Sequence, residues 1–242
     1  MPRDLGFSQD LEALNARFAN DPQGAIAHVT TGALGRGALV SSFGAESAVL
    51  LHMAARIDPG LTVIFIDTLM LFPETLAYHE RLAADLGLTD VRRIGPDRVE
   101  LFLQDPETGL HRTDPDACCT LRKARPLERA LAPFDVWISG RKRYQGGERA
   151  RLEMFEHDAP RELIKLNPLA GTSRAELRAY MERHSLPPHP LVARGFPSIG
   201  CQPCTGTVAP GEDTRAGRWR GWQKTECGIH RVAGPVLREV GP

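Results

Sequence analysis

Residues 37–68, with the sequence GALVSSFGAESAVLLHMAARIDPGLTVIFIDT, decide the fold class. An apolar run over 37–44 ends in small residues, and the following segment, 45–56, has apolar positions at helical spacing. A Pro-Gly pair then precedes a second apolar run at 61–68, which is rich in β-branched residues and has the length of a strand. This stretch predicts a strand, a helix and a second strand in succession.

The same alternation continues on both sides of this stretch. Additional helices are expected over 8–30 (with a break at Pro22), 72–87 and 173–187, and additional strands over 91–96, 135–142 and 161–169. The last helix begins with Ser173 and Glu176, which have the spacing of a capping box. Strands that alternate with helices in this way predict an α/β fold with a doubly wound, mainly parallel sheet.

Composition excludes several classes of protein. The chain has 242 residues, and its 30 Lys and Arg residues balance 30 Asp and Glu residues. A net charge of zero argues against a surface devoted to nucleic acid. No apolar stretch approaches the roughly 18 residues of a membrane span, and the N-terminus lacks the apolar block of a signal peptide. We therefore expect a cytoplasmic protein that binds neither nucleic acid nor membranes; the sequence leaves its oligomeric state open, a homo-oligomer included.

The character of the chain changes beyond residue 187. Residues 188–242 are rich in Gly, Pro and Arg, show weak periodicity and hold three of the five cysteines. We expect an N-terminal helical segment over 1–35, a nucleotide-binding α/β domain over 36–187, and a tail over 188–242 that lies over the sheet. The odd number of cysteines argues against a disulfide framework.

The segment SSFGAES, residues 41–47, lies where the first strand runs into its helix. Small residues at such a turn let backbone N–H groups approach an anion, and the N-terminus of the helix favours negative charge. Asp67 and Thr68 end the next strand, at the edge of a parallel sheet where ligands bind. These features predict a nucleotide-binding loop, and the alternative is a tight turn without a ligand.

Four of the five cysteines form two close pairs, Cys118 with Cys119 and Cys201 with Cys204. Four thiolates suit a zinc ion or a [4Fe–4S] cluster, and an adjacent pair is atypical of structural zinc. If 116–124 is a helical turn, Arg122 and Lys123 lie on the same face as the first pair, where they would offset an anionic cluster. The alternatives are a buried pair beside an unrelated CxxC, or a thioredoxin-like redox motif.

The fifth cysteine, Cys227, lies in the segment KTECGIH, residues 224–230. Its cationic neighbours favour the nucleophilic thiolate, although a single cysteine near a terminus can also be incidental. Gly-rich connecting segments supply arginines suited to phosphate or sulfate: Arg141, Arg143, Arg149, Arg215, Arg218 and Arg220. An ordinary solvated basic loop is the alternative for these.

Together, the segments SSFGAES, DTLMLFPETL, CC-x2-RK-x2-PL, CQPC, EDTRAGRW and KTECGIH resemble those of the assimilatory sulfonucleotide reductases. These enzymes reduce adenylyl sulfate (APS) or its 3′-phosphorylated form (PAPS) to sulfite. The matching segments run from about residue 40 to 230. The two cysteine pairs are similar to those of the branch that carries a [4Fe–4S] cluster and uses APS. The resemblance implies an adenine nucleotide alpha hydrolase-like, or ATP-pyrophosphatase-like, fold with a catalytic tail.

The resemblance also implies roles for particular residues. Cys118, Cys119, Cys201 and Cys204 would be the cluster ligands. Cys227 would be the nucleophile that attacks the sulfur of APS and forms an S-sulfocysteine, which thioredoxin or a glutaredoxin-like protein then reduces. The substrate-binding residues would be Ser42, Gly44, Glu46, Lys123, Arg149, Arg215, Arg218 and His230.

Rival functions leave parts of this pattern unexplained. The nearest rival is a PAPS reductase, or an enzyme that accepts both substrates. An ATP-pyrophosphatase-like ligase or tRNA thiolation enzyme would use the loop 41–47 but leaves KTECGIH and EDTRAGRW without a role. An iron–sulfur redox sensor would use the cysteine pairs but leaves the nucleotide loop and Cys227 unexplained.

Overall fold

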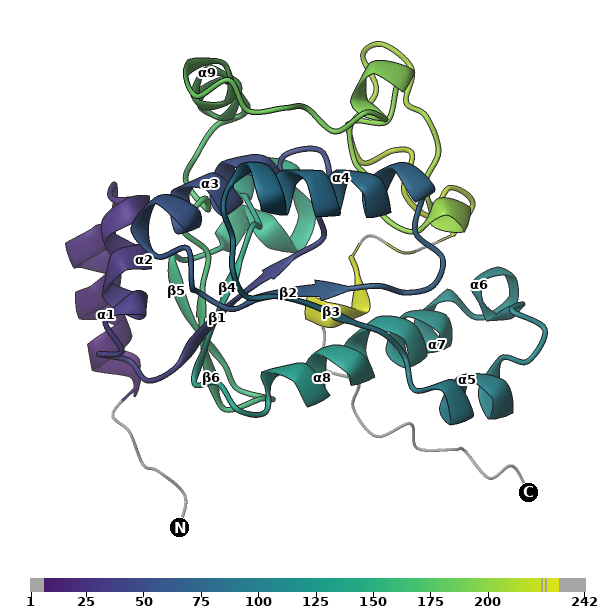
Figure 1. Cartoon of the computed structure of the whole chain (residues 1–242), viewed down its shortest axis with the longest axis horizontal. Coiled ribbons are helices and arrows are strands. Elements are labelled where there is room, and N and C mark those ends of the chain that lie inside the picture. The colour runs from purple at the N-terminus through teal and green to yellow at the C-terminus, as the bar shows by residue number, and fades with distance from the viewer. Residues whose placement is uncertain (1–6, 223, 225, 231–242) are drawn as a thin grey trace.

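The computed structural model describes residues 7–222, 224 and 226–230 of the chain. Its centre is a six-stranded sheet with the strand order β3-β2-β1-β4-β6-β5 (Figure 1). Neighbouring strands are parallel, except for β5 and β6, which are antiparallel. The strands are β1 (Gly37–Ser41), β2 (Val63–Ile66), β3 (Val91–Ile94), β4 (Val136–Ser139), β5 (Phe155–Asp158) and β6 (Leu163–Leu166). The predicted α/β class with a mainly parallel sheet is confirmed.

Helices cover both faces of this sheet, as the doubly wound arrangement requires (Figure 1). On one face, Ile26, Leu51 and Leu82 of three successive helices belong to the larger apolar core. On the other face, Leu127 packs in a smaller core with Trp137 of β4. The helices are α1 (Phe7–Phe18), α2 (Pro22–Thr30), α3 (Ser47–Ile57), α4 (Pro73–Asp85), α5 (Arg98–Gln104), α6 (Leu110–Thr113), α7 (Pro115–Cys119), α8 (Arg125–Leu131) and α9 (Arg174–Arg183).

Local sequence signals account for several of these boundaries. Pro22 occupies the first turn of α2, so the predicted break in 8–30 is the start of a second helix. At α9, Ser173 Oγ accepts from the Glu176 N–H at 3.2 Å, and a Glu176 carboxylate oxygen accepts from the Ser173 N–H at 2.7 Å. The predicted capping box is therefore present.

Two regions differ from the expectation drawn from sequence. The edge strand β5 is not predicted, because three of its four residues, Glu156, His157 and Asp158, are polar. Between β3 and β4 the chain forms a series of short helices, of which the sequence predicts only a turn over 116–124. That turn consists of α7 followed by one π-helical turn, η1 (Thr120–Ala124).

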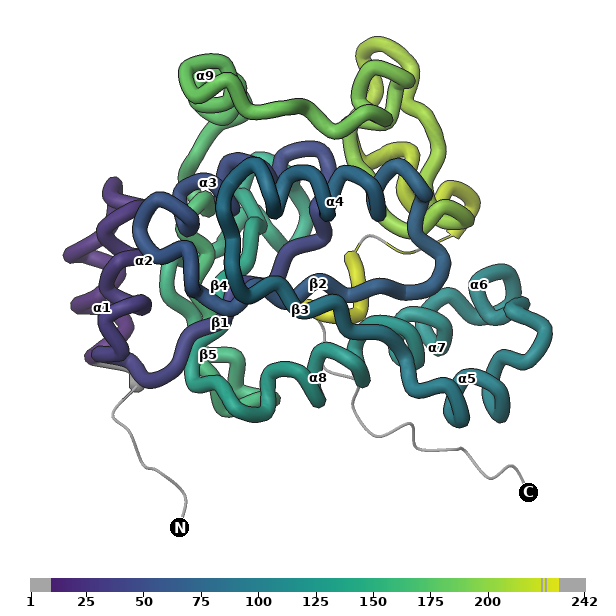
Figure 2. Tube along the Cα trace, viewed as in Figure 1, coloured from purple at the N-terminus to yellow at the C-terminus, as the bar shows by residue number. Residues whose placement is uncertain are grey.

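The chain beyond α9 lies over the sheet domain and beside α4 (Figure 2). Its described residues contain only 3-10 turns of three residues each, which agrees with the weak periodicity of the sequence. Leu191 and Ile199 share a small apolar cluster with Phe72, which precedes α4. A β-bridge also joins Cys201 to Leu71. Within the described residues, no helix is long and apolar enough to cross a membrane.

Candidate active site

A cavity of about 840 Å³ lies between the carboxyl ends of the parallel strands and the residues that follow α9. This is the edge of an open α/β sheet at which ligands bind. The residues predicted to act on substrate all line it: Ser42, Gly44, Glu46, Lys123, Arg149, Arg215, Arg218, Cys227 and His230. Segments from β1 to the C-terminal region therefore converge on one site.

The turn between β1 and α3 forms one wall of the cavity. Ser47 Oγ accepts from the Gly44 N–H at 2.9 Å, and Ser41 Oγ accepts from the N–H of Phe43, a buried residue with φ of 47°. A Cβ added at Gly44 would lie 3.3 Å from Ser42 Oγ and 3.5 Å from the carbonyl oxygen of Ile199. The chain after α9 therefore lies within van der Waals contact of this loop.

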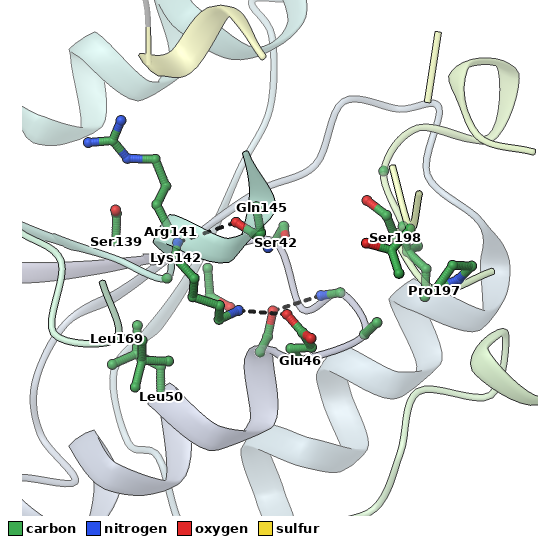
Figure 3. Close-up of a pocket in the computed structure, with 18 of the residues that line it drawn as sticks. Ser42, Glu46, Leu50, Ser139, Arg141, Lys142, Gln145, Leu169, Pro197 and Ser198 are labelled. Atoms are coloured by element: carbon green, nitrogen blue, oxygen red, sulfur yellow. Dashed lines mark hydrogen bonds and ion pairs between the residues drawn. The ribbon is translucent and has the colours of Figure 1, made fainter. Parts of the chain in front are cut away.

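Glu46 is held by two side chains that sequence reasoning missed, Lys142, which is labelled beside it in Figure 3, and Tyr144. Lys142 Nζ donates to one carboxylate oxygen at 2.9 Å, and the Tyr144 hydroxyl donates to the other at 2.5 Å. Burial alone raises the pKa of Glu46, but the charge of Lys142 and the two hydrogen bonds lower it overall. Both partners follow the end of β4 in GRKRYQ, so polar residues after a buried strand are the signal that could have found them.

The two cysteine pairs come from different parts of the chain. Cys118 and Cys119 end α7, immediately before the π-helical turn, and a π turn within a helix often marks a functional site. Cys201 and Cys204 flank a 3-10 turn. Thr68 Oγ1 lies 3.2 Å from Cys201 Sγ, which ties the second pair to the end of β2.

Among the described residues, no three His, Cys, Asp or Glu side chains are arranged as a ready metal site. The surroundings of the cysteines nevertheless fit an anionic group with acceptor atoms. The side-chain N–H groups Arg122 Nε, Arg218 Nε and Trp219 Nε1 are buried without a partner. Trp219 also donates its backbone N–H to the Cys204 carbonyl oxygen at 3.1 Å. Cysteine sulfurs hold protein-bound iron–sulfur clusters, and nearby cations and hydrogen-bond donors tune them.

Lys123 connects the cysteine pairs with the cavity. Burial by itself lowers the pKa of its ammonium, but the nearby thiols of Cys201, Cys227 and Cys119 raise it overall. Lys123 therefore stays charged, and thiols of both cysteine pairs and of Cys227 act on its charge.

Cys227 is the cysteine that faces the cavity together with the cations. A hydrogen bond from the Cys119 thiol, with the charges of Lys123 and Arg218, lowers the pKa of Cys227 well below its usual range, against the effect of burial. If Cys119 were a thiolate ligand it could not donate, and the two cations alone would then favour the Cys227 thiolate. Gly228 fits closely beside Cys119, since an added Cβ would lie 3.3 Å from the Cys119 Cβ. The cavity thus holds an activated thiol next to cationic side chains.

Glu226 anchors the segment that carries Cys227. Arg149 Nε and Nη2 donate to its two carboxylate oxygens at 2.5 and 2.6 Å, and Arg215 lies 3.8 Å away. Glu226 also accepts from the Cys227 N–H at 2.8 Å. Arg149 also donates to Gln145, and it lines the cavity beside this anchor. Sequence reasoning missed Glu226, because its main partner, Arg149, lies 77 residues away along the chain.

The fold and the site together define a nucleotide-binding α/β protein with thiol chemistry at the carboxyl edge of its sheet. The model of the phosphoadenosine phosphosulfate reductase domain matches residues 36–207, and the chain belongs to this family. The resemblance to sulfonucleotide reductases found in the sequence is thereby confirmed.

Individual relatives support the same family. The chain is 53% identical over 193 residues to the adenosine 5′-phosphosulfate reductase of Mesorhizobium japonicum, covering 80% of this chain and 75% of that one. It is 46% identical to the adenosine 5′-phosphosulfate reductase of a Chelativorans species, covering 95% and 94% of the two chains. Among solved structures, the phosphoadenylyl-sulfate (PAPS) reductase of Candida auris in its phosphate complex has a TM-score of 0.69, 25% identity and coverage of 83% and 97%.

Proposed function

We propose that this protein reduces adenylyl sulfate to sulfite and AMP in sulfate assimilation and cysteine biosynthesis, using thioredoxin or a glutaredoxin-like protein as reductant. The observation that carries this proposal is the position of Cys227. Its thiol shares one cavity with the nucleotide loop and with Lys123, Arg215 and Arg218. The two relatives described above, both named adenosine 5′-phosphosulfate reductase, support APS as the substrate.

The cavity has two chemically different ends, which match the two ends of a sulfonucleotide. Leu50 and Leu169 line it near Glu46 of the nucleotide loop, where the charge of Lys142 is paired with Glu46 (Figure 3). Lys123 and Arg218 line it and act on the Cys227 thiol. An adenosine group fits the first environment, and the phosphate and sulfate oxygens fit the second.

The reaction then follows from the position of Cys227. Its thiolate attacks the sulfur of APS, an S–S bond forms, and the bond between sulfur and the phosphate oxygen breaks with its electron pair on AMP. A thioredoxin thiolate next attacks Cys227 Sγ and releases sulfite, and the second thioredoxin thiol frees Cys227 while thioredoxin is oxidised to its disulfide. Lys123 and Arg218 stabilise the oxyanions during the first step.

Cys118, Cys119, Cys201 and Cys204 would hold a [4Fe–4S] cluster, whose contribution when bound is to position these segments and to shape the local electric field. The two electrons for reduction of the substrate come from thioredoxin thiols, so thiol chemistry alone balances the reaction. Arg122 is the side chain that supports the first pair. Its guanidinium donates to Asp105 at 2.7 Å and to the Thr68 carbonyl oxygen at 3.1 Å.

The same proposal includes the division of the chain predicted from its sequence, into a helical segment over 1–35, a nucleotide-binding domain over 36–187 and a tail over 188–242. In this proposal the tail completes the cluster site and supplies the nucleophile. A cytoplasmic location agrees with this chemistry, because free thiols and reduced thioredoxin require a reducing compartment.

PAPS is the second candidate substrate, since the Candida auris structural neighbour is named a PAPS reductase. The deciding experiment is a sulfite-release assay on anaerobically purified holoprotein with reduced thioredoxin, comparing APS with PAPS at equal concentrations. Our proposal predicts a higher kcat/KM for APS by at least about tenfold, or about 1.4 kcal/mol in transition-state binding. Preference for PAPS would reverse the assignment of substrate, and no sulfite from either compound would contradict the proposed function.

Arg215→Ala is expected to weaken APS binding about 10- to 100-fold, because a lost charged hydrogen bond costs roughly 1.5–3 kcal/mol. Adenosine should bind as it does to the parent, because it lacks the anionic end. Arg220→Ala is the matched control: Arg220 follows on the same loop, is exposed, pairs with Glu212, and is not among the described residues that line the cavity. Calorimetric titration of both variants with both ligands checks this. Equal APS affinity in both variants would place the anion site elsewhere.

A further inference from the structure

Lys165 is a charged residue in the middle of a buried strand. It lies in β6, is 5% exposed, and pairs across the sheet with Trp137 of β4 and Glu156 of β5. A buried ammonium is costly unless its charge is compensated. Its Nζ lies 4.2 Å from the centroid of the Trp137 ring and 3.3 Å from His230 Nδ1. Lys165 itself is not among the described residues that line the cavity, whereas His230 is.

His230 is fixed in place at the end of the Cys227 segment. Its ring stacks on Trp137 with 5.7 Å between centroids and an interplanar angle of 15°. The backbone N–H of His230 donates to the Cys227 carbonyl oxygen at 3.1 Å. The Arg161 guanidinium donates to the carbonyl oxygen of Ile229 at 3.2 Å. The imidazole therefore has a defined orientation relative to the nucleophile, with Nδ1 toward Lys165.

The contact with Lys165 selects one tautomer of the imidazole. When Lys165 is charged, its ammonium has only donors, so His230 Nδ1 accepts, and the proton of the neutral ring then resides on Nε2. Burial and the charges of Arg141 and Arg161, opposed by Asp158 and Glu156, together lower the pKa of Lys165 to about 7. The face of the indole ring favours the cationic form.

The surroundings also keep this imidazole uncharged. Burial lowers the pKa of His230 well below its usual range, and the charges of Lys165, Arg141, Arg149 and Arg161 lower it further. A neutral imidazole with its proton on Nε2 can donate one hydrogen bond on the side of the ring away from Lys165. Its place in the cavity wall makes the oxyanions of a bound substrate the natural acceptor.

We propose that Lys165 is a positioning residue that acts through His230: it holds the imidazole as the Nε2–H tautomer, so that Nε2–H donates a hydrogen bond to the substrate oxyanion while Cys227 attacks. This inference rests on the proposed function. No proton is transferred in the step. The Cys227–sulfur bond forms, the sulfur–oxygen bond breaks, and the hydrogen bond stabilises negative charge as AMP departs.

The test uses the holoenzyme and a single turnover without thioredoxin, in which the rate of AMP release reports the attack by Cys227. Lys165→Met keeps an unbranched stem against Trp137 but removes the donor. It should slow AMP release about tenfold at saturating APS and leave the Kd of APS within about twofold, because a transition-state hydrogen bond is lost. Lys165→Arg, which retains a cationic donor, should recover most of the rate.

A double-mutant cycle separates action through His230 from a general structural effect. His230→Ala should slow the same step by about tenfold or more, and adding Lys165→Met to that variant should cause no further loss. Multiplicative losses in the double variant, or a parent-like rate in Lys165→Met, would overturn the inference while leaving the proposed function intact. Absence of AMP release by the parent protein would instead reject the proposed function itself.

Discussion

Cys227→Ser is expected to abolish sulfite release from APS while leaving the iron content and the affinity for APS at their parent values. The hydroxyl of serine lacks the nucleophilicity of a thiolate, and the cations beside Cys227 that favour the thiolate cannot ionise a hydroxyl. The turnover rate should fall by a factor on the order of 10⁴ or more, as expected when a nucleophile is removed.

The APS affinity and the iron content of the Cys227→Ser variant serve as controls for its folding. APS affinity is measured by calorimetric titration and iron by chemical analysis of the same preparation. The close approach of Gly228 to Cys119 and the Glu226–Arg149 pair should both persist, because serine is slightly smaller than cysteine and leaves the backbone contacts unchanged. Appreciable turnover in Cys227→Ser would show that another group attacks the substrate, and loss of iron would make Cys227 a ligand.

Cys204→Ser should have the second largest effect. Unlike Cys227→Ser, it should remove the iron. Anaerobically purified parent protein should be brown and hold about four irons per chain. The variant should be colourless, and the segment around it should become less stable, because metal binding contributes directly to folding. The Cys204 carbonyl oxygen accepts from the Trp219 N–H, so disorder at this turn should extend to the arginine loop.

Iron analysis, visible absorption and limited proteolysis of the Cys204→Ser and Cys227→Ser variants check this prediction. The two substitutions are chemically identical, and both side chains are partly buried, so each variant is a control for the other. We expect iron loss and faster cleavage only in Cys204→Ser. Stoichiometric zinc without iron in the parent would contradict the cluster assignment.

Sequence signals of short range predicted much of the fold. The apolar runs at 37–44 and 61–68 correspond to β1 and β2, because buried parallel strands are nearly continuous in apolar residues. The π-helical turn at Thr120–Ala124 could not be predicted from the sequence, because its hydrogen bonds depend on how the helix packs rather than on the helix propensity of its residues. The polar edge strand β5 forms because it pairs with β6, which lies inside the sheet.

The site was predictable in its residue types but not in its pairings. The motifs identified Cys227 and the loop arginines, because reactive thiols and anion-binding groups leave local patterns. The Arg149–Glu226 pair joins positions 77 residues apart, and the Lys165–His230 contact joins positions 65 apart. Such contacts depend on tertiary structure. The motifs predict Arg149 as a substrate-binding residue, and its pairing with Glu226 could not be predicted from them.

The most direct test of the central claim is to find where the sulfur of APS goes. Holoenzyme is mixed with excess APS in the absence of thioredoxin, quenched, and examined by intact and peptide mass spectrometry. We predict one AMP released per chain, an added mass of one SO3 group on the peptide that contains Cys227, and discharge of that mass as sulfite when reduced thioredoxin is added. An adduct on Cys118 or Cys201, or AMP release with no adduct on the protein, would contradict the account.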